Sequence, residues 1–383
     1  MTTAARHLLV TNDFPPKVGG IQAYLWELWR RLDPEAYVVL TSSSHPDAAA
    51  FDAEAAGAGI RILRAPARTL LPTPATVRRV RRCAAEVGAG FLVVDPAVPL
   101  GLAAPAVGLP YAVVLHGAEV TVPGRLPVGR RALAAVLARS ALAVCAGGYP
   151  AAEARRATGG RMPPVVEVPP GVDTDRFTVL DAEGRAAARR AAGIAEGALV
   201  VLSVSRLVPR KGMDVLVRAV AALAGEFPDL SLVVAGDGRD RRRLESMAGR
   251  LRAPVRFLGR VPDDRLAGLY GAADVFAMAC RNRWGGLEQE GFGIVFLEAA
   301  AAGLPQVAGR SGGAHEAVAD GETGVVVDRP GDPAEVARAL RPLLGDPGLR
   351  RRMGEAARER ARRSFDYDLL APRLAAALDD VPG

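Results

Sequence analysis

Only two lysines, Lys17 and Lys211, occur among the 49 Lys and Arg residues of this chain, and each lies in a short segment marked by glycine and proline. Arg206 and Lys211 follow residues 198–205, an apolar, β-branched stretch that is typical of a buried parallel strand. Open α/β sheets bind ligands at the carboxyl ends of such strands, and an arginine fork beside a lysine charge suits a diphosphate. We therefore expect Arg206 and Lys211 to bind a diphosphate.

Two carboxylates, Glu290 and Glu298, follow later in the chain, with glycines between them. Glu298 begins an Ala-rich helical run, which places Glu290 in the loop ahead of that helix if Glu298 lies in its first turn. Carboxylates accept hydrogen bonds from hydroxyl groups. Two cations together with two carboxylates therefore indicate a site for a sugar nucleotide.

Residues 13–20 join the first expected strand to the first expected helix and read Asp-Phe-Pro-Pro-Lys-Val-Gly-Gly. Backbone amides of Gly19 and Gly20 would open the helix, and a helix N-terminus binds anions. The alternative is a plain tight turn, but the adjacent Lys17 favours a phosphate. The run is not G-x-G-x-x-G, and no such fingerprint follows any other expected strand, which argues against a nicotinamide or flavin enzyme.

His116 comes directly after an expected strand, residues 111–115, and is followed by Gly117. A position at the carboxyl end of a strand favours a role in a ligand site, and a packed or solvated imidazole is the alternative. Asp173 and Asp175 form a D-x-D sequence that could carry a divalent cation. Their place just beyond a Pro-Pro-Gly linker favours a turn or a helix cap instead.

Two arginine clusters lie in the first half of the chain, which carries a formal net charge of +7 over its full length. Such runs are usually solvated, and binding to anionic lipid headgroups is the alternative. Nucleic acid is not indicated, because no aromatic residues alternate with the basic ones. The clusters are Arg30 with Arg31, and Arg78, Arg79, Arg81 and Arg82.

The 383 residues, 50% of them hydrophobic, are enough for two domains with separate cores. The three cysteines and four histidines fall into no metal-binding or disulfide pattern, so we expect no metal. No stretch of 18 apolar residues is present, so we expect a cytoplasmic protein without a transmembrane span.

Strand-like and helix-like runs alternate through both halves of the chain, which predicts an α/β fold with two doubly wound Rossmann-like domains that face each other across a cleft. The first, acceptor-binding domain is expected over residues 1–172, and the second, donor-binding domain over residues 173–365, with a hinge near residues 169–180. The last helix, within residues 366–383, is expected to cross back onto the first domain. The expected strands are residues 7–11, 37–41, 60–63, 91–94, 111–115, 141–145 and 165–168 in the first half, and 198–204, 231–235, 255–258, 274–278, 306–308 and 324–327 in the second.

Several of these segments together resemble the retaining family-4 glycosyltransferases of the GT-B fold, and the resemblance spans nearly the whole chain. Finer points in residues 11–16, 171–177, 205–212 and 280–283 are similar to the actinobacterial mannosyltransferases that use GDP-mannose and act on phosphatidylinositol mannosides. Residues 146–148 and 284–287 depart from the family pattern. The segments that carry the resemblance are residues 13–21, 116–119, 169–177, 205–212, 290–298 and 311–313.

This resemblance implies a role for each candidate residue in binding GDP-mannose and a glycolipid acceptor, without a further cofactor. Catalysis is assigned to Arg206, Lys211, Glu290 and His116, and the acceptor side to Asp13, Lys17, Tyr24, His116 and Glu119. The donor would be bound by Arg206 and Lys211 at the diphosphate, Gly19 and Gly20 at the distal phosphate, Glu298 at the ribose, Gly259, Arg260 and Val261 at the base, and Glu290, Phe292, Gly293 and Ile294 at the sugar.

The implied reaction transfers mannose with retention at the anomeric carbon. Glu290 is expected near sugar hydroxyls rather than on the far face of the sugar, so front-face substitution is preferred to double displacement. Arg206 and Lys211 would then neutralise the charge that develops on the diphosphate without a metal ion. A non-catalytic protein that binds sugar nucleotides or lipid headgroups is the alternative of a different class. An enzyme of this kind would be cytoplasmic or peripheral on the inner face of the cell membrane.

Overall fold

The computed structural model describes residues 6–43 and 45–382; residues 1–5, 44 and 383, which fall within the predicted domain ranges, lie outside the described part. The chain divides into two compact units. Unit 1 comprises the residues up to Pro170 and those from Tyr367 onward, and unit 2 is Gly171–Asp366. Within the described residues, no helix is both long and apolar enough to cross a bilayer.

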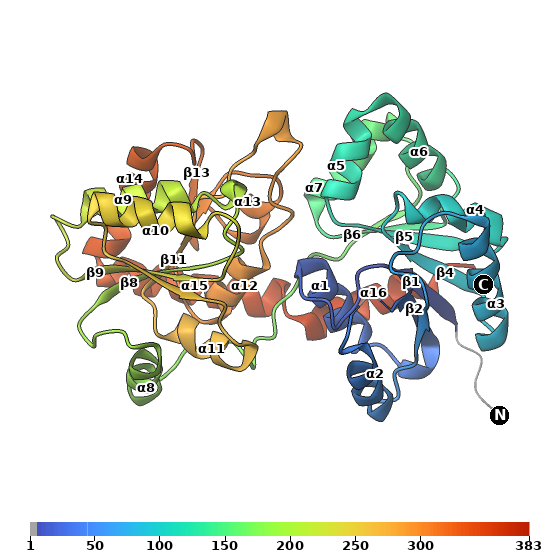
Figure 1. Ribbon diagram of the computed structural model, residues 1–383, viewed down its shortest axis with the longest axis horizontal. Helices are drawn as coiled ribbons and strands as arrows, with labels where there is room; N and C mark the ends of the chain where they lie inside the picture. Colours follow the sequence, from blue (N-terminus) through green and yellow to red (C-terminus); the bar gives the residue numbers. More distant parts are fainter. Residues whose placement is uncertain (1–5, 44, 383) are drawn as a thin grey trace. The chain divides into compact units, whose positions relative to one another are not determined.

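Unit 1 is built on a seven-stranded parallel sheet with the order β3-β2-β1-β4-β5-β6-β7 (Figure 1). The order reverses between β1 and β4, where Thr11 pairs with Asp95 at the carboxyl ends of both strands. Such a reversal opens a crevice for ligands in doubly wound sheets. The strands are β1 (His7–Thr11), β2 (Tyr37–Ser42), β3 (Ile62–Ala65), β4 (Phe91–Asp95), β5 (Tyr111–Leu115), β6 (Leu142–Cys145) and β7 (Val165–Glu167).

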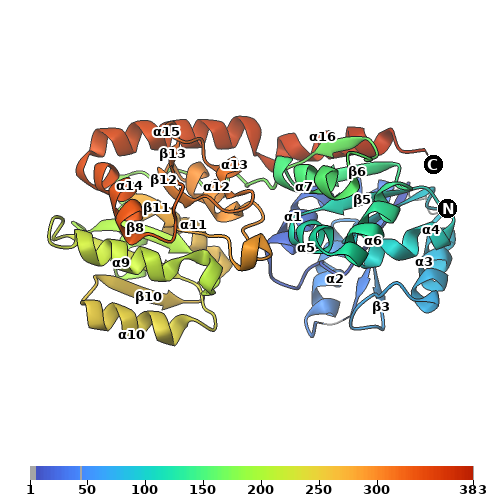
Figure 2. The same ribbon diagram turned by 90° about the horizontal axis from the view of Figure 1, so that it is seen from above.

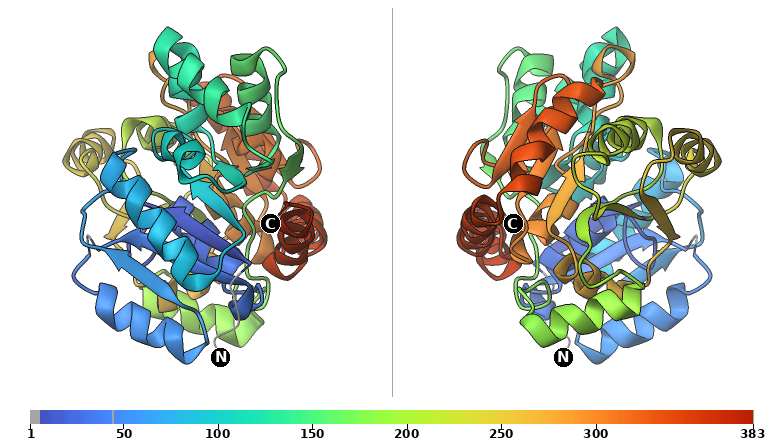
Figure 3. Two further views of the ribbon diagram at one scale, coloured as in Figure 1. Left: turned by 90° about the vertical axis from the view of Figure 1, so that its right-hand side faces the viewer. Right: turned by 90° about the vertical axis from the view of Figure 1, so that its left-hand side faces the viewer.

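Helices cover both faces of this sheet because nearly every residue of its central strands is apolar and buried (Figures 1 and 3). On one face α3 (Pro74–Val87), α4 (Ala104–Val107), α5 (Ala118–Arg125), α6 (Pro127–Leu137) and α7 (Gly148–Thr158) pack into one cluster. On the other face lie α1 (Gly20–Trp29), α2 (Ala48–Gly57) and α16 (Tyr367–Asp379). Two short 3₁₀ turns, η1 (Pro34–Ala36) and η2 (Leu100–Ala103), complete the unit.

Unit 2 repeats the same plan with a six-stranded parallel sheet of order β10-β9-β8-β11-β12-β13. Its reversal lies between β8 and β11. The strands are β8 (Leu199–Val204), β9 (Leu230–Ala235), β10 (Val255–Gly259), β11 (Val275–Met278), β12 (Gln306–Gly309) and β13 (Gly324–Val327).

The helices of unit 2 form two layers, with α9 and α10 on the opposite side of the sheet from α15 (Figure 2). The first layer contains α9 (Met213–Leu223), α10 (Arg241–Leu251) and α14 (Pro333–Gly345). The second contains α11 (Asp263–Gly271), α12 (Ile294–Ala301), α13 (Ala314–Ala317) and α15 (Pro347–Ser364), with α8 (Ala182–Ala192) beside α11. Two 3₁₀ turns, η3 (Pro209–Lys211) and η4 (Trp284–Gly286), lie in its loops.

The strands predicted from the sequence are confirmed in number and in position along the chain, with ends that differ by at most two residues. The apolar residues of the segment that begins at Ile21 recur at i, i+3, i+4, i+7 and i+8, which predicts an amphipathic helix over residues 20–32. This prediction is three residues too long, because α1 ends at Trp29. The apolar face predicted for this helix is confirmed, since Tyr24, Leu25, Leu28 and Trp29 are all buried.

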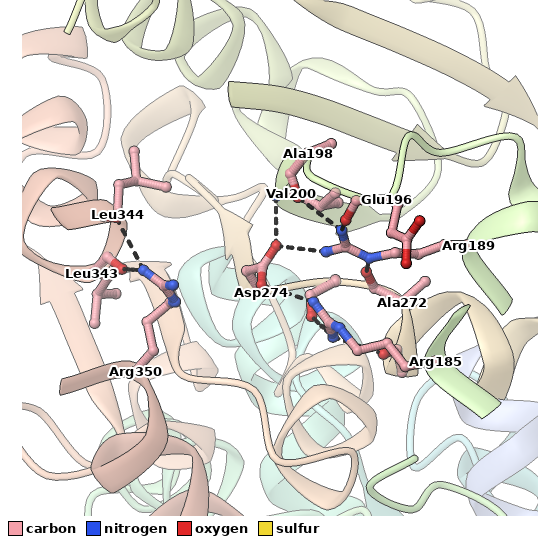
Figure 4. Close-up of polar contacts among 12 residues, drawn as sticks. Arg185, Arg189, Glu196, Ala198, Val200, Ala272, Asp274, Leu343, Leu344 and Arg350 are labelled. Atoms are coloured by element: carbon pink, nitrogen blue, oxygen red, sulfur yellow. Dashed lines mark hydrogen bonds and ion pairs between the residues drawn. The ribbon is translucent and has the colours of Figure 1, made fainter. Parts of the chain in front are cut away.

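A charged cluster at the amino-terminal edge of the second sheet fixes the start of β8 and β11 (Figure 4). Asp274 accepts hydrogen bonds from Arg185 at 2.8 Å, from Arg189 at 3.0 Å and from the amide of Val200 at 2.7 Å. Arg189 is only 6% exposed and also donates to the carbonyls of residues 198 and 272, so it satisfies loop carbonyls that would otherwise be buried without partners.

Candidate active site

A charged cluster in unit 2 surrounds the buried Glu290, beyond the carboxyl end of β8. One carboxylate oxygen of Glu290 lies 2.7 Å from Lys211 Nζ and 2.8 Å from Arg210 Nη1. Glu290 and Lys211 are each 8% exposed, so water screens this contact little. Burial alone would raise the pKa of Glu290, but Lys211 and Arg210 outweigh burial and hold that pKa below its ordinary value.

Glycines allow the backbone segments that carry Lys211 and Glu290 to pack closely against their neighbours. Gly212, which follows Lys211, has φ 67°, and a Cβ there would lie 1.8 Å from the carbonyl oxygen of Ala279. Gly312 has φ 51°, and a Cβ there would lie 1.9 Å from the carbonyl oxygen of Glu290. The Glu290 amide also donates to Ser311 Oγ at 3.1 Å, so the Ser-Gly-Gly turn fixes the backbone of Glu290.

Glu298 lies in α12, the helix that follows Glu290 in the chain. It is the fifth residue of the helix, so it begins the second turn rather than lying in the first. Its Oε2 accepts a hydrogen bond of 2.6 Å from the buried Tyr270 hydroxyl, and burial raises its pKa above the ordinary value although that bond acts in the opposite direction. The structure therefore holds the carboxyl of Glu298 in a fixed orientation.

The remaining donor candidates of unit 2 lie in loops after strands. Arg206 is exposed, and no partner for its side chain is found within residues 6–43 and 45–382. Gly259 ends β10 with φ 73° and is followed by the exposed Arg260 and the half-buried Val261. Phe292 is buried and Gly293, with φ 89°, caps the start of α12 at Ile294.

In unit 1, a second cluster forms at the reversal between β1 and β4. Asp95, which is fully buried, contacts Thr11 Oγ1 at 2.7 Å and His116 Nε2 at 2.8 Å through its two oxygens. The Tyr24 ring meets the His116 ring edge-on at 5.2 Å. The imidazole of His116 is therefore packed, as the alternative interpretation predicted, and it also lies at the carboxyl ends of the strands.

The other candidates of unit 1 surround this cluster with their own hydrogen bonds. Glu119 accepts from the amides of His116 and Gly117, the latter at 2.9 Å. Asp13 accepts from Gln22 Nε2 at 2.6 Å, and burial, followed by the charge of Asp95, raises its pKa.

Two of the acceptor candidates have polar groups that are already bonded within unit 1. Lys17 Nζ donates to the Asn12 carbonyl at 2.7 Å and to Ser42 Oγ at 3.1 Å. The Tyr24 hydroxyl donates to the Val168 carbonyl at 2.8 Å, and its side chain belongs to the core.

The first helix begins as the sequence indicated, at the Gly-Gly pair. Gly19 precedes α1 in an extended conformation, and no side chain caps the first amides of the helix. A Cβ on Gly19 would lie 2.2 Å from Gln22 Oε1, so a side chain there would displace the Gln22 amide group that bonds to Asp13. Gly20 is the first residue of α1.

The D-x-D sequence caps a turn. Asp173 Oδ1 accepts from the amides of Asp175 at 3.2 Å and Arg176 at 2.9 Å, as the capping interpretation predicted. Within the described residues, no group of three or more His, Cys, Asp or Glu side chains is arranged to hold a metal ion.

Two functional candidates were missed by the sequence analysis. Arg210 shares the carboxylate of Glu290 with Lys211, and its position next to Lys211 in a short Pro-led turn was the available signal. Asp95 lies one residue beyond the expected strand 91–94 and was given no role, although it ends β4 and is the partner of His116.

The imidazole of His116 makes the pH dependence of stability testable. Burial disfavours the charged ring, but the charge of Asp95 and its hydrogen bond outweigh burial, so the pKa of His116 is raised. A raised pKa stabilises the fold fully below the ordinary value of 6.5, and this stabilisation is lost as pH rises through the folded-state pKa.

We therefore expect the melting temperature of H116Q to lie furthest below that of the parent near about pH 5.5, and the gap to narrow by about pH 9. Thermal unfolding of both proteins across this range checks the prediction. A gap that is constant or widens with pH would contradict it.

Comparison with known proteins shows the family of the chain. Residues 184–360 match the family described as glycosyl transferases group 1. A GDP-mannose-dependent alpha-(1-6)-phosphatidylinositol monomannoside mannosyltransferase of Mycolicibacterium smegmatis is 38% identical, and the match covers 97% of each chain. The Mycobacterium tuberculosis protein of the same name is 40% identical with the same coverage.

Solved structures agree at the level of the fold. Anabaena HepE in complex with UDP has a TM-score of 0.82 at 22% identity, covering 98% of this chain and 100% of that one. WaaG, a glycosyltransferase involved in lipopolysaccharide biosynthesis, has a TM-score of 0.70. The two doubly wound sheets are those of the GT-B fold, as predicted. Since full-length relatives share well over a third of their residues with it, the chain belongs to the group 1 glycosyl transferases.

Proposed function

We propose that this glycosyltransferase transfers mannose from GDP-mannose to a phosphatidylinositol mannoside and retains the configuration of the anomeric carbon. The observation that carries the proposal is the similarity along 97% of both chains to mannosyltransferases with that donor and acceptor in their names. The cluster of Lys211, Arg210 and Glu290 supports it, because it joins cations for a diphosphate to a carboxylate for sugar hydroxyls.

In the proposed reaction, Arg206 and Lys211 neutralise the negative charge that grows on the leaving diphosphate. Glu290 orients hydroxyl groups of the sugar, and Glu298 orients those of the ribose. The leaving phosphate accepts the proton of the attacking hydroxyl, so the bond from the anomeric carbon to the phosphate breaks on the face where the new bond forms. Gly259, Arg260 and Val261 contact the base, and the backbone of residues 292–294 contacts the sugar.

Side chains supply all the positive charge in this proposal, so we expect full turnover in excess chelator. Asp13, Lys17, Glu119, Tyr24 and His116 are proposed to lie on the acceptor side, and the amides at the helix start, Gly19 and Gly20, are proposed to bind the distal phosphate of the donor.

The test is product formation from radiolabelled GDP-mannose, UDP-glucose and ADP-glucose with phosphatidylinositol monomannoside in detergent. The proposal expects label in the lipid from GDP-mannose alone, and the α-linkage is read by NMR of the product. Preference for another nucleotide sugar would overturn the assignment of GDP-mannose as donor, and preference for a soluble acceptor would overturn the assignment of a phosphatidylinositol mannoside as acceptor. Binding of donor without any product would favour the non-catalytic class.

We also propose that unit 1 binds an anionic membrane surface through α3. Arg78 and Arg82 are exposed, and Leu71, just ahead of the helix, is 51% exposed. Arg81 is used differently, because it donates to the carbonyls of residues 106 and 107.

The other arginine cluster of unit 1 is not part of this surface. Arg30 pairs with Glu27 at 2.6 Å, and Arg31 pairs with Asp368 at 2.6 Å. Their charges are therefore compensated within the unit, and the membrane-binding interpretation is retained only for α3.

Removing two α3 charges in the R78Q/R82Q double variant should weaken vesicle binding by about 2 kcal/mol, or roughly thirtyfold, at about 1 kcal/mol per arginine. Co-sedimentation with phosphatidylinositol-containing vesicles measures this effect, which should shrink as salt is raised. The matched control is R351Q/R352Q, which removes two exposed charges from α15. Equal loss in both double variants would show that only net charge matters.

A further inference from the structure

An exposed tryptophan stands on the loop that leads to Glu290. Residues 281–289 form the loop of unit 2 that connects β11 to Glu290, and Trp284 in this loop is 64% exposed. The other two tryptophans, Trp26 and Trp29, lie in α1, where Trp29 is fully buried. Trp284 is therefore the most exposed indole of the chain.

The loop holds Trp284 in a backbone conformation that bulky residues avoid. Trp284 has φ 49°, and Gly285 and Gly286 follow with φ 61° and 83°. The conformation is fixed by hydrogen bonds from the Arg283 amide to the Glu288 carbonyl at 2.8 Å and from Gln289 Nε2 to the Gly286 carbonyl at 2.7 Å. Strain of this kind, held by its surroundings, is concentrated at ligand sites.

Arg283 fixes the orientation of the indole. Its guanidinium lies 4.7 Å from the ring centroid of Trp284 and is itself held by Glu288 Oε2 at 2.8 Å. The ring thus remains largely exposed and is also restrained, which reduces the entropy that a stacking ligand would have to overcome.

A chain of alternating charges connects this loop to the proposed donor residues. Glu288, which holds Arg283, also lies 4.0 Å from Arg210 Nε. Arg210 in turn contacts Glu290 at 2.8 Å, and Glu290 contacts Lys211 at 2.7 Å. The loop base is therefore linked to the place where the sugar of the donor is proposed to lie.

We propose that Trp284 is a stacking platform for the sugar ring of the acceptor. A hexopyranose has one face lined by C–H groups, and these groups complement the negative face of an aromatic ring. The diphosphate, ribose, base and sugar of the donor already have proposed partners in unit 2, which leaves the acceptor for Trp284. This inference rests on the proposed function.

A membrane surface is the competing occupant, because tryptophan also inserts at lipid interfaces. Only Leu287, at 39% exposure, adds apolar surface beside Trp284, whereas the rest of the loop carries Arg281, Arg283, Glu288 and Gln289. Inserting this loop would desolvate those polar groups, so a sugar fits it better.

The first test is steady-state kinetics with GDP-mannose and short-chain phosphatidylinositol monomannoside in detergent. W284A should raise the KM for the acceptor about tenfold and leave the KM for GDP-mannose unchanged, while W284F should stay within about threefold of the parent. The matched control is L287A, which removes the neighbouring exposed apolar side chain and should change neither constant.

An unchanged acceptor KM in W284A, or equal effects on donor and acceptor, would overturn the proposal. Weaker vesicle binding by W284A with an unchanged acceptor KM in detergent would assign the ring to the membrane instead. Failure of the parent enzyme to make product from GDP-mannose would instead count against the proposed function.

A second measurement does not need turnover. Acrylamide quenching of tryptophan fluorescence should fall when the deacylated headgroup, a mannosyl glycerophosphoinositol, is added to the parent. The same addition to W284F should have no effect, because only the α1 tryptophans remain. Undiminished protection in W284F would show that the effect comes from the α1 tryptophans and that Trp284 does not contact the headgroup.

Discussion

Substituting methionine for Lys211 is expected to lower kcat by roughly 10²–10³-fold, the usual cost of removing one preorganised charge from a transition state. Lys211 is buried beside Glu290 at 2.7 Å, so little solvent is available to replace it. Its loss leaves Glu290 with Arg210 as partner at 2.8 Å, and the fold should therefore persist. Single-turnover transfer of labelled mannose measures the effect on chemistry.

The matched control is Arg341→Met, which removes a cation from an exposed ion pair with Glu226 on the surface of unit 2. It should turn over at the parent rate. Lys211→Arg is informative as well, since a guanidinium is larger and cannot reproduce the point charge of lysine in a buried position. Parent-like turnover by K211M, with an unchanged melting temperature, would remove Lys211 from the proposed mechanism.

The largest expected effect on stability comes from Asp274→Ala. This change removes the acceptor shared by Arg185, Arg189 and the Val200 amide, and leaves two guanidinium groups facing each other without a counter-charge. Breaking a buried ion pair by removing one partner costs about 3–5 kcal/mol of unfolding free energy. Because the chain has two compact units, the unfolding transition of unit 2 should move and that of unit 1 should not.

Denaturant unfolding, monitored by hydrogen exchange, distinguishes the unfolding of the two units. The matched control is Asp328→Ala, which removes an exposed carboxylate paired with Arg310 and should cost below about 1 kcal/mol. If both variants shift the transition equally, the cluster around Asp274 contributes no more than a surface pair.

The positions of the strands along the chain were predictable because a parallel sheet covered on both faces requires continuous apolar runs, and such runs are visible in a single sequence. Residues 199–204 and 275–278 show this directly, since nearly all are apolar and buried. The end of α1 was not predictable from periodicity, because Leu32 continues the apolar pattern but lies beyond the helix.

The site was predictable only in part, because side-chain partners depend on which strands become neighbours. Lys211 and Glu290 were recognised from their local motifs, and the structure brings them into contact. Asp95 and His116 are separated by a whole helical crossover, and only the adjacency of β4 and β5 makes them partners. The same limit applies to Arg31, whose partner Asp368 comes from the far end of the chain.

Unit 2 starts and finishes at one point: the Val172 amide donates to the Phe365 carbonyl at 2.8 Å, and Thr174 bonds to Asp366. A segment whose two ends touch can be cut out and rejoined with little chain rearrangement. Residues 171–366 can therefore be exchanged as one piece, and grafting the corresponding stretch of another glycosyltransferase between the same two ends would replace the proposed donor residues together with Trp284 while leaving unit 1 as it is.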